Sequence, residues 1–313
     1  MRSNPKAQIS RPTGFALVAV LWLIAILALA SVTTLRVISF DMQLATAKVH
    51  GSRACHLAEM GIAIGSNAII QRDDPLLHRI DEANNEEYHV SLHSEGARFN
   101  INSLVLSEDK TLLRSIFIHW GLDLDSAQAL TDAFSDWVDG DDEVALNGAE
   151  IKEYEKLSRI NQPFNRPFYD VAEMSLVLGM DQAAALRPDW KNWFTVFSSG
   201  TLDINEANAE LIAIAAEVSP EQAAIIPETV RGTDDILDTD DDARFEDINS
   251  ALTLLGIGGE VGQRIAPRFT TQDDTTRISS LGRSGDAKRR INVIVRNRTG
   301  RPLLLERNIE IVP

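Results

Sequence analysis

The N-terminal apolar segment constrains this chain more than any other feature of its sequence. Residues 15–30 read FALVAVLWLIAILALA, and no charged residue lies between Arg11 and Arg36. At 1.5 Å per residue, a helix over that uncharged stretch is about 36 Å long, enough to span a hydrocarbon core of roughly 30 Å. A buried core helix is the alternative, but helices of soluble proteins rarely continue so far without a solvent-facing charge. The sequence therefore predicts a membrane-spanning helix.

The residues around this segment predict its orientation. Arg2, Lys6 and Arg11 precede it and no acidic residue does, so we expect the N-terminus on the cytoplasmic side and the rest of the chain beyond the membrane. The apolar run is longer than the core of a typical secretory signal peptide. No proline or glycine follows it until Gly51, and apolar residues recur beyond that point. The helix is therefore expected to continue as a stem to about residue 70.

The composition excludes several classes of protein. The net charge is −16 at pH 7 although the N-terminus is basic, and an acidic body repels phosphate backbones, so nucleic-acid binding is not expected. The single cysteine, Cys55, excludes an intrachain disulfide. The chain has no HExxH, GxSxG or P-loop motif, and Cys55 falls within the predicted stem without an obvious base nearby. We therefore do not expect an enzyme.

Downstream of the stem, the periodicity changes from strand to helix. Tyr88, Val90 and Leu92 alternate with polar residues, as in a half-buried strand. His89 and His93 lie between them and could be metal ligands, although such histidines more often line the wet face of a strand. One strand is therefore expected before a long helical region.

The helical region extends from about residue 100 to 267, with loops rich in proline, glycine and asparagine. Apolar residues at helical spacing mark helices around residues 112–117, 127–138, 171–178, 211–215 and 251–255, the last of the series. Strand patterns return at residues 278–281, 291–296 and 303–312, and the NRTG sequence at 297–300 is typical of a hairpin turn. This order predicts an α+β fold with a long N-terminal helix, a small antiparallel sheet and a large inserted all-α domain.

The helical region contains a faint internal repeat. Residues 99–104 (FNINSL) are similar to residues 202–207 (LDINEA), and each copy precedes an apolar helix. Asn102 or Asn205 could cap that helix by accepting a hydrogen bond from its free N–H groups. The second copy resembles the start of a helix-hairpin-helix or SAM-like unit.

The LGIG sequence at residues 255–258 has two interpretations. It resembles the hairpin of helix-hairpin-helix DNA-binding proteins, whose glycine amides hold a phosphate. The neighbouring residues 228–247 are rich in aspartate and glutamate, which opposes a phosphate backbone, so a tight turn between two helices is favoured. The acidic run at residues 234–242 is interpreted as a solvated or disordered loop.

Another acidic segment has the spacing of calcium ligands. Residues 136–143 read DWVDGDDE, and four acids fall at positions 1, 3, 5 and 12 of an EF-hand loop: Asp139, Asp141, Glu143 and Glu150. Val144 stands at position 6, where an EF-hand has glycine, so a true EF-hand is not expected. The segment is either a calcium site or a solvated acidic loop. The candidate ligands are Asp136, Asp139, Asp141, Asp142, Glu143 and Glu150.

The start of the chain resembles a type IV prepilin signal. A short basic leader ends at Gly14, and Phe15 follows at once and opens the apolar run. The resemblance implies that a prepilin peptidase removes residues 1–14 and that the new amine of Phe15 is methylated. Ala19 stands at the fifth mature position, where most pilins carry a glutamate that engages a neighbouring subunit's amine.

Taken together, these features resemble the large minor pseudopilin of type II secretion, the general secretion pathway protein K family. The DWVDGDDE run, GAE at 148–150, DVAEM at 170–174 and LVLG at 176–179 look like a corresponding series in that family. The resemblance covers nearly the whole chain and implies Ca²⁺ in the helical domain. The expected division is a leader (1–14), a transmembrane and stem helix (15–70), the first part of the pseudopilin α+β domain (71–99), an inserted helical domain of two SAM-like or helix-hairpin-helix-like units (100–275) and C-terminal strands (276–313).

The resemblance implies a structural role. The chain is expected to cap the tip of the periplasmic pseudopilus of type II secretion and to help start its assembly. The expected partners are the other minor pseudopilins, the prepilin peptidase and the cell inner membrane, crossed once with the C-terminal domain in the periplasm. A minor pilin of a type IV pilus or a DNA-uptake system is the alternative.

Overall fold

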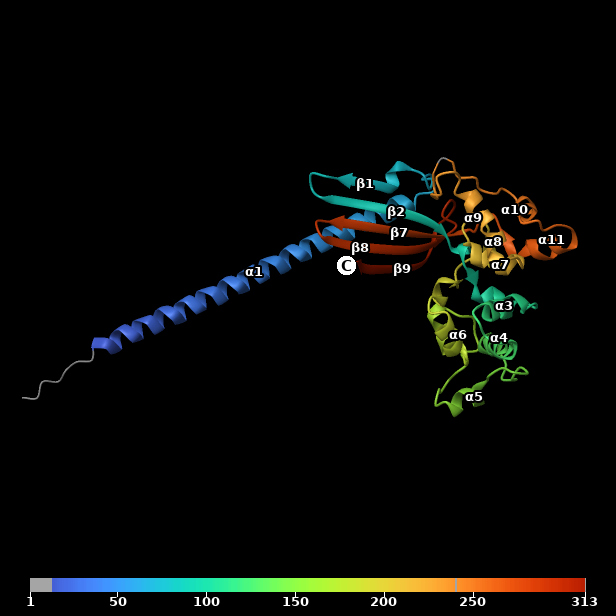
Figure 1. Ribbon diagram of the computed structural model, residues 1–313, viewed down its shortest axis with the longest axis horizontal. Coiled ribbons are helices and arrows are strands. Elements are labelled where there is room, and N and C mark those ends of the chain that lie inside the picture. Colours follow the sequence, from blue (N-terminus) through green and yellow to red (C-terminus); the bar gives the residue numbers. More distant parts are fainter. Residues whose placement is uncertain (1–12, 240, 313) are drawn as a thin grey trace, which may run out of the picture.

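The computed structural model describes residues 13–239 and 241–312, so residues 1–12 of the predicted leader lie outside the described residues. The described chain begins with one continuous helix, α1 (Thr13–Gly65), about 80 Å long at 1.5 Å per residue. A window of this helix has a mean hydropathy of 2.8 and none of it is buried in the protein, so α1 is long and apolar enough to cross a membrane. The predicted stem is present, but it ends at Gly65 and not near residue 70. Figure 1 shows α1 projecting from the rest of the protein.

The C-terminal part of α1 packs on a five-stranded antiparallel sheet (Figure 1). The strands lie in the order β1 (His78–Asp81), β2 (Glu86–Ser94), β7 (Thr275–Ser284), β8 (Ala287–Arg296) and β9 (Leu303–Val312). The predicted strand at 88–92 and the C-terminal hairpin are confirmed. Strand β1 is not predicted, because four residues with one apolar side chain show no alternation.

Helix α1 approaches the sheet very closely because both surfaces carry small residues. Ala54 and Ala58 are fully buried, and Gly61 and Gly65 continue the same face of the helix. On β7, Gly282 faces this helix so closely that a Cβ would overlap the backbone of Ala54 and Ala58. The apolar core between helix and sheet consists of Ile70, Leu77, Tyr88, Val90, Leu92, Ile278, Ile291, Val293 and Val295.

The turn between β8 and β9 holds the end of the stem. Arg298 donates hydrogen bonds to the backbone carbonyls of Gly65, Asn67 and Ile70, at 3.1, 2.8 and 3.1 Å. The last carbonyls of a helix lack partners within the helix, so this guanidinium satisfies groups that would otherwise need water. The C-terminal hairpin thereby fixes the point where the chain leaves α1.

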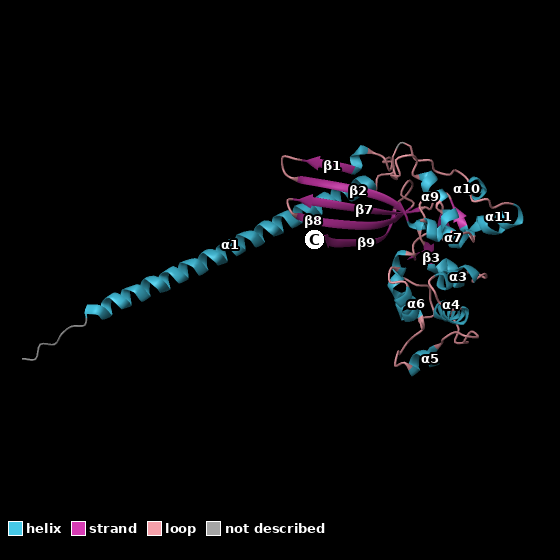
Figure 2. Ribbon diagram, viewed as in Figure 1, coloured by secondary structure: helices cyan, strands magenta, loops and turns pink. Residues whose placement is uncertain are grey.

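The helical domain is inserted between β2 and β7 and lies at the end of the sheet away from the exposed part of α1 (Figure 2). Its first unit contains a 3₁₀ turn (Glu95–Ala97), β3 (Phe99–Asn100), α2 (Ile101–Leu106), α3 (Thr111–His119), α4 (Leu124–Val138), α5 (Ile151–Lys156), a 3₁₀ helix (Val171–Leu176), α6 (Met180–Leu186), a 3₁₀ turn (Trp190–Asn192) and β4 (Phe194–Thr195). Its second unit contains β5 (Leu202–Asp203), α7 (Ala209–Ala216), α8 (Pro220–Ala223), α9 (Ile225–Val230), α10 (Ile248–Leu254), α11 (Gly259–Ile265), a 3₁₀ turn (Ala266–Arg268) and β6 (Phe269–Thr270).

The internal repeat corresponds to the same construction in both units. In each unit a short parallel pair brings the two ends together, β3 with β4 and β5 with β6. Asn102 accepts a hydrogen bond from the backbone N–H of Phe168 (2.8 Å) and donates to its carbonyl (2.9 Å). Asn205 makes the same two bonds to Phe245, at 2.8 and 3.0 Å. In each unit the repeated asparagine therefore holds the backbone of a phenylalanine that is distant in sequence.

Several sequence expectations in this domain are wrong in detail. The helix caps are Asn100 and Asn208, and not Asn102 and Asn205, whose side chains are used by the two phenylalanines. The helix expected at 171–178 is a 3₁₀ helix that ends at Leu176, and the helix at 251–255 is not the last, since α11 follows it. Between α10 and α11 the chain makes the expected tight turn, with Gly256 at φ +71°.

A buried ion-pair cluster joins the helical domain to the sheet. Glu95, which has no solvent exposure, accepts hydrogen bonds from Arg98 (2.6 Å), from Arg277 on β7 (2.6 Å) and from Thr195 on β4 (2.5 Å). A buried carboxylate is tolerated only where such partners replace water. The cluster therefore sets how the first unit is placed on the sheet.

We expect Gly282→Ala to lower the free energy of unfolding by about 1–3 kcal/mol, because the added methyl group meets backbone atoms of α1 that cannot turn away. Gly262→Ala in α11 is the matched control. The nearest atom there lies 3.8 Å from the new Cβ and alanine favours helix, so stability should be unchanged or rise by up to about 1 kcal/mol. Urea unfolding of the full chain in detergent measures both values. Equal effects would contradict the close contact.

Candidate functional site

The predicted calcium loop joins α4 to α5 in the first unit of the helical domain. The last turn of α4 is anchored by Trp137, whose ring packs against Tyr154 (5.6 Å between centroids), Phe164 (5.0 Å) and Phe168 (6.2 Å). The aromatic rings hold both ends of the acidic loop against the core, since Tyr154 lies on α5. The loop is therefore not a freely solvated segment along its whole length.

Asp136 and Glu150 are buried at the two ends of this loop, 1% and 2% exposed. The Asp136 carboxylate accepts a hydrogen bond from the backbone N–H of Ala145 (3.2 Å), and Gly148 packs on it so closely that a Cβ would overlap it. Neither carboxylate oxygen of Glu150 has a hydrogen-bond partner among the described residues. A buried carboxylate without a partner is costly unless it is protonated or binds a cation.

The charges of these acids oppose one another. Burial, and then the neighbouring charges of Asp136 and Asp139, raise the pKa of Glu150 to about 7. Burial also raises the pKa of Asp136, with Asp139 adding to the effect, and burial followed by Asp141 raises the pKa of Asp139. Like charges in one place disfavour the ionised form, and a bound cation reverses that effect.

The structure separates the six candidate ligands into two groups. Asp136, Asp139 and Glu150 lie close enough for their charges to raise one another's pKa values. One oxygen of Asp139 also lacks a hydrogen-bond partner within the described chain. Asp142 contributes to the pKa of Glu150 but its residue is exposed, as are Asp141 and Glu143. These three acids form the outer rim of the loop: Asp141, Asp142 and Glu143. The EF-hand spacing therefore does not describe the arrangement.

The sequence does not reveal a further polar group at this site, Asn165. Its side-chain amide donates to the backbone carbonyl of Asp141 at 3.1 Å, and its buried Oδ1 has no partner among the described residues. Asn165 is distant from the acidic run in sequence, so spacing could not find it. In the structure Asn165 adopts a positive φ of 48°, which asparagine tolerates better than most residues.

These donors fit a calcium ion better than a transition metal. All are carboxylate or amide oxygens, the ligands that Ca²⁺ accepts in loose geometry. Within residues 13–239 and 241–312, no group of three or more His, Cys, Asp or Glu side chains is already arranged for ligation. Binding would therefore need the side chains of Asp139 and Glu150 to turn towards a common point.

In calcium-free buffer we expect the stability of the chain to fall as the pH rises from about 4.5 to 7. The pKa of Glu150 is raised from its ordinary 4.5 to about 7, so the folded state holds the proton more tightly and loses this stabilisation as the proton leaves. The loss is on the order of 3 kcal/mol. Thermal unfolding across this range measures it, and Glu150→Gln should flatten the curve. A wild-type curve that rises over the same range would contradict the assignment.

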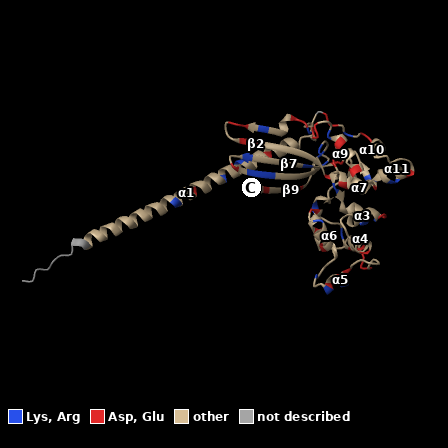
Figure 3. Ribbon diagram, viewed as in Figure 1, with Lys and Arg blue, Asp and Glu red and all other residues tan. Residues whose placement is uncertain are grey.

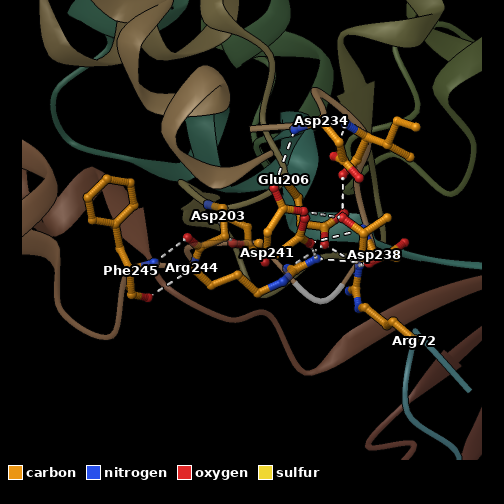
Figure 4. Close-up of polar contacts among 12 residues, drawn as sticks. Arg72, Asp203, Glu206, Asp234, Asp238, Asp241, Arg244 and Phe245 are labelled. Atoms are coloured by element: carbon orange, nitrogen blue, oxygen red, sulfur yellow. Dashed lines mark hydrogen bonds and ion pairs between the residues drawn. The ribbon is translucent and has the colours of Figure 1, made fainter. Parts of the chain in front are cut away.

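The second acidic run, residues 234–242, is only partly the solvated or disordered loop expected from the sequence, since Asp234, Asp235 and Asp241 are exposed but Asp238 and Asp242 are half-buried. Figure 4 shows that Glu206 accepts hydrogen bonds from both Arg72 and Arg244, with Arg244 at 2.9 Å. Arg244 also pairs with Asp238 at 3.0 Å. Burial raises the pKa of Asp238, whereas hydrogen bonds from Thr233 lower that of Asp241. Since Arg72 follows the stem, this network ties the second unit to the pseudopilin-like part of the chain.

The two acidic loops have similar places in the chain order of the two units. The first lies between α4 and α5, before Phe168, and the second follows α9 and leads to Phe245. Figure 3 marks the acidic residues along both. In the second unit, arginines supply the positive charge. In the first unit, the buried Glu150 has no such partner among the described residues.

The remaining candidate residues take ordinary positions. His89 and His93 are exposed on β2, as expected for a wet strand face, and the His89 ring lies edge-on to His78 at 5.3 Å. Phe15 and Ala19 are exposed on the apolar part of α1. Gly14 belongs to the first turn of the same helix.

A long apolar helix on an antiparallel sheet, with a helical domain inserted between two strands, is the architecture expected of a pseudopilin with an enlarged globular domain. Residues 97–188 match the family profile described as "Type II secretion system (T2SS), protein K". The chain is 27% identical over 241 residues to type II secretion system protein K of Klebsiella pneumoniae, covering 69% of this chain and 73% of that protein. It is 39% identical over 72 residues to protein K of Dickeya chrysanthemi, covering 23% and 19%. Residues 97–188 thus resemble a domain of type II secretion system protein K, and the similarity to the Klebsiella pneumoniae protein extends over most of the chain.

A solved structure supports the same fold across most of the chain. A chain of the GspK-GspI-GspJ complex from enterotoxigenic Escherichia coli matches with a TM-score of 0.62 at 16% identity. The match covers 87% of this chain and 99% of that chain. The predicted α+β fold with an inserted helical domain is thus confirmed.

Proposed function

We propose that this chain is the minor pseudopilin that caps the tip of the periplasmic pseudopilus of a type II secretion system and helps to start its assembly. The observation that carries the proposal is the position of the helical domain. It lies beyond the end of the sheet that is away from the exposed part of α1 (Figure 1). In a filament of parallel stems, this is where the next subunit would stack, so the domain leaves room for neighbours on one side only.

The membrane segment supports the same assignment. Ala19 carries no carboxylate to pair with a neighbour's N-terminal amine, so one of the usual contacts between adjacent subunits is missing. We propose that α1 crosses the inner membrane once, with the N-terminus in the cytoplasm and the sheet and helical domain in the periplasm. Cleavage after Gly14 and methylation of Phe15 by a prepilin peptidase belong to this proposal. The partners would be the smaller minor pseudopilins.

Co-expression with a prepilin peptidase and the other pseudopilins tests this function. We expect an intact mass that begins at methylated Phe15, and antibody against the helical domain should label one end of purified pseudopili. Gly14→Arg should abolish both results, because the cleavage site is lost. Pseudopili labelled uniformly along their length would exclude tip placement, and a mature chain that keeps residues 1–14 would exclude the proposed processing.

We also propose that the first acidic loop binds Ca²⁺. The support is the buried carboxylate of Glu150 beside Asp136 and Asp139, which among the described residues has neither a hydrogen-bond partner nor a neutralising arginine of the kind found in the second unit. Glu150, Asp136 and Asp139 would hold the ion, with Asp142 and Asn165 as further oxygen donors. The ion would supply positive charge that joins the end of α4 to the start of α5, and it would have no part in catalysis.

Calcium is expected to raise the melting temperature of the full chain in detergent. At a hundredfold excess over Kd the gain corresponds to roughly 2.7 kcal/mol. Glu150→Gln should lose that gain and, at pH 7.5 without calcium, should melt above the wild type because it removes a buried negative charge. Glu143→Gln, an exposed acid of the same loop, is the matched control and should keep the calcium response. A wild type that does not respond to calcium would rule out the site.

A further inference from the structure

One face of the edge strand β9 carries exposed apolar side chains. In the β8–β9 register, Leu304 is opposite Val295 and Ile309 is opposite Ile291, two residues that are buried beneath α1. Opposite residues in paired strands point to the same face of a sheet. Leu304 and Ile309 therefore lie on the stem side of the sheet, and so does Ile311, two residues beyond Ile309. They are 57%, 49% and 75% exposed.

These side chains are exposed because α1 does not extend over them. The helix packs on β2, β7 and β8. A helix about 10 Å wide covers about three strands spaced 4.8 Å apart, so it does not reach the next strand, β9. Arg307, on the same face of β9, reaches back to Glu59 of α1 at 2.9 Å. Strand β9 is also one of the two edge strands of the described sheet, the other being β1. Beside α1 there is consequently an uncovered strip of apolar side chains, interrupted only by Arg307, whose guanidinium turns towards α1.

A cation lies at the membrane-proximal end of this strip. Arg289 is opposite Ile311 in the register, and its guanidinium lies next to Gly51 of α1. It donates to the carbonyl of Lys288 at 2.8 Å, and no carboxylate pairs with it among the described residues. A partner that covers the strip would therefore gain from placing a carboxylate at this end.

We propose that this strip, the β9 shelf formed by Leu304, Ile309, Ile311 and Arg289, binds the stem helix of a second pseudopilin. The partner helix would lay an apolar face on the three aliphatic side chains and a carboxylate beside Arg289. The proposal rests on the proposed function, because it assumes that the partner is anchored in the same membrane with its helix parallel to α1.

Continuity with the membrane segment favours a helix as the occupant. The apolar side chains of α1 are exposed along residues 15–49, so a parallel neighbour would contact α1 in the membrane and meet the β9 shelf above it. Packed helices lie 8–10 Å apart, which places the neighbour over β9. An added edge strand fits less well. It would pair with the β9 backbone and leave the stem-side face uncovered, while the other face carries Glu306 and Glu310.

Two neighbouring residues of β9 allow a matched test. Leu304→Glu places a charge on the shelf, and Leu303→Glu places the same charge on the opposite face of the same strand, at 57% and 58% exposure. The full chain is co-expressed with the other minor pseudopilins, solubilised in detergent and purified by its own tag. We expect Leu304→Glu to reduce the recovered partner at least tenfold and Leu303→Glu to leave it unchanged. Equal recovery with both variants would overturn the proposal.

The positive charge at the membrane-proximal end of the β9 shelf is tested in the same way. Arg289→Glu should weaken the complex, whereas Arg290→Glu, the next residue and on the other face of β8, should not. If the wild-type chain itself recovers no pseudopilin, the proposed function is overturned. If only the shelf variants lose the partner, the proposed function stands, so the two outcomes are distinguishable. Melting temperatures of all variants identify any that fail to fold.

Cross-linking identifies the occupant. Ile309→Cys is placed in a Cys55→Ser background and paired with single cysteines along the partner's stem helix or its edge strand. Disulfides to the stem helix, at positions three or four residues apart, are expected. Disulfides to the partner's edge strand alone would show that β9 is extended by strand pairing and would overturn the proposal.

Discussion

The close packing of α1 on β7 is the contact on which the rest of the structure depends. Gly282 removes the side chain that would keep the strand away from the backbone of Ala54 and Ala58. Strand β7 pairs with β2, so the chain enters the helical domain from the end of β2 and returns from it into the neighbouring strand β7. The position of the helical domain relative to the exposed apolar part of α1 therefore follows from one helix–sheet interface, strengthened by the hydrogen bonds of Arg298 to Gly65 and Ile70.

The two helical units differ in how the repulsion between their clustered carboxylates is balanced. The second unit places Arg72 and Arg244 on Glu206, so its charge is balanced by side chains and its loop is tied to the segment that follows the stem. The first unit buries Glu150 beside Asp136 without a partner among the described residues, which raises the pKa of Glu150. The proposed calcium ion would be the counterpart of those arginines. Under this proposal the acidic loop of the second unit is stabilised by arginine side chains, and that of the first unit is stabilised by a bound cation.

The molecule offers different surfaces at its two ends. The helical domain covers the end of the sheet away from the exposed part of α1, whereas the stem side of β9 remains open beside α1 (Figure 1). A subunit with one blocked end and one open flank can end a filament but cannot continue it. The proposed tip position and the proposed β9 shelf are two consequences of the same asymmetry.

The sequence by itself determined the long apolar helix, the order of elements and the inserted helical domain, because apolar length and periodicity depend on neighbours along the chain. It also identified the repeated asparagines and the acidic loop. It could not assign their roles, since Asn102 and Asn205 bind phenylalanines 66 and 40 residues away and Asn165 meets the loop only after folding. Which acids are buried, which are neutralised by arginine and which face of β9 stays uncovered were decided by tertiary structure alone. Burial and charge pairing depend on distances in space, and local sequence does not specify those distances.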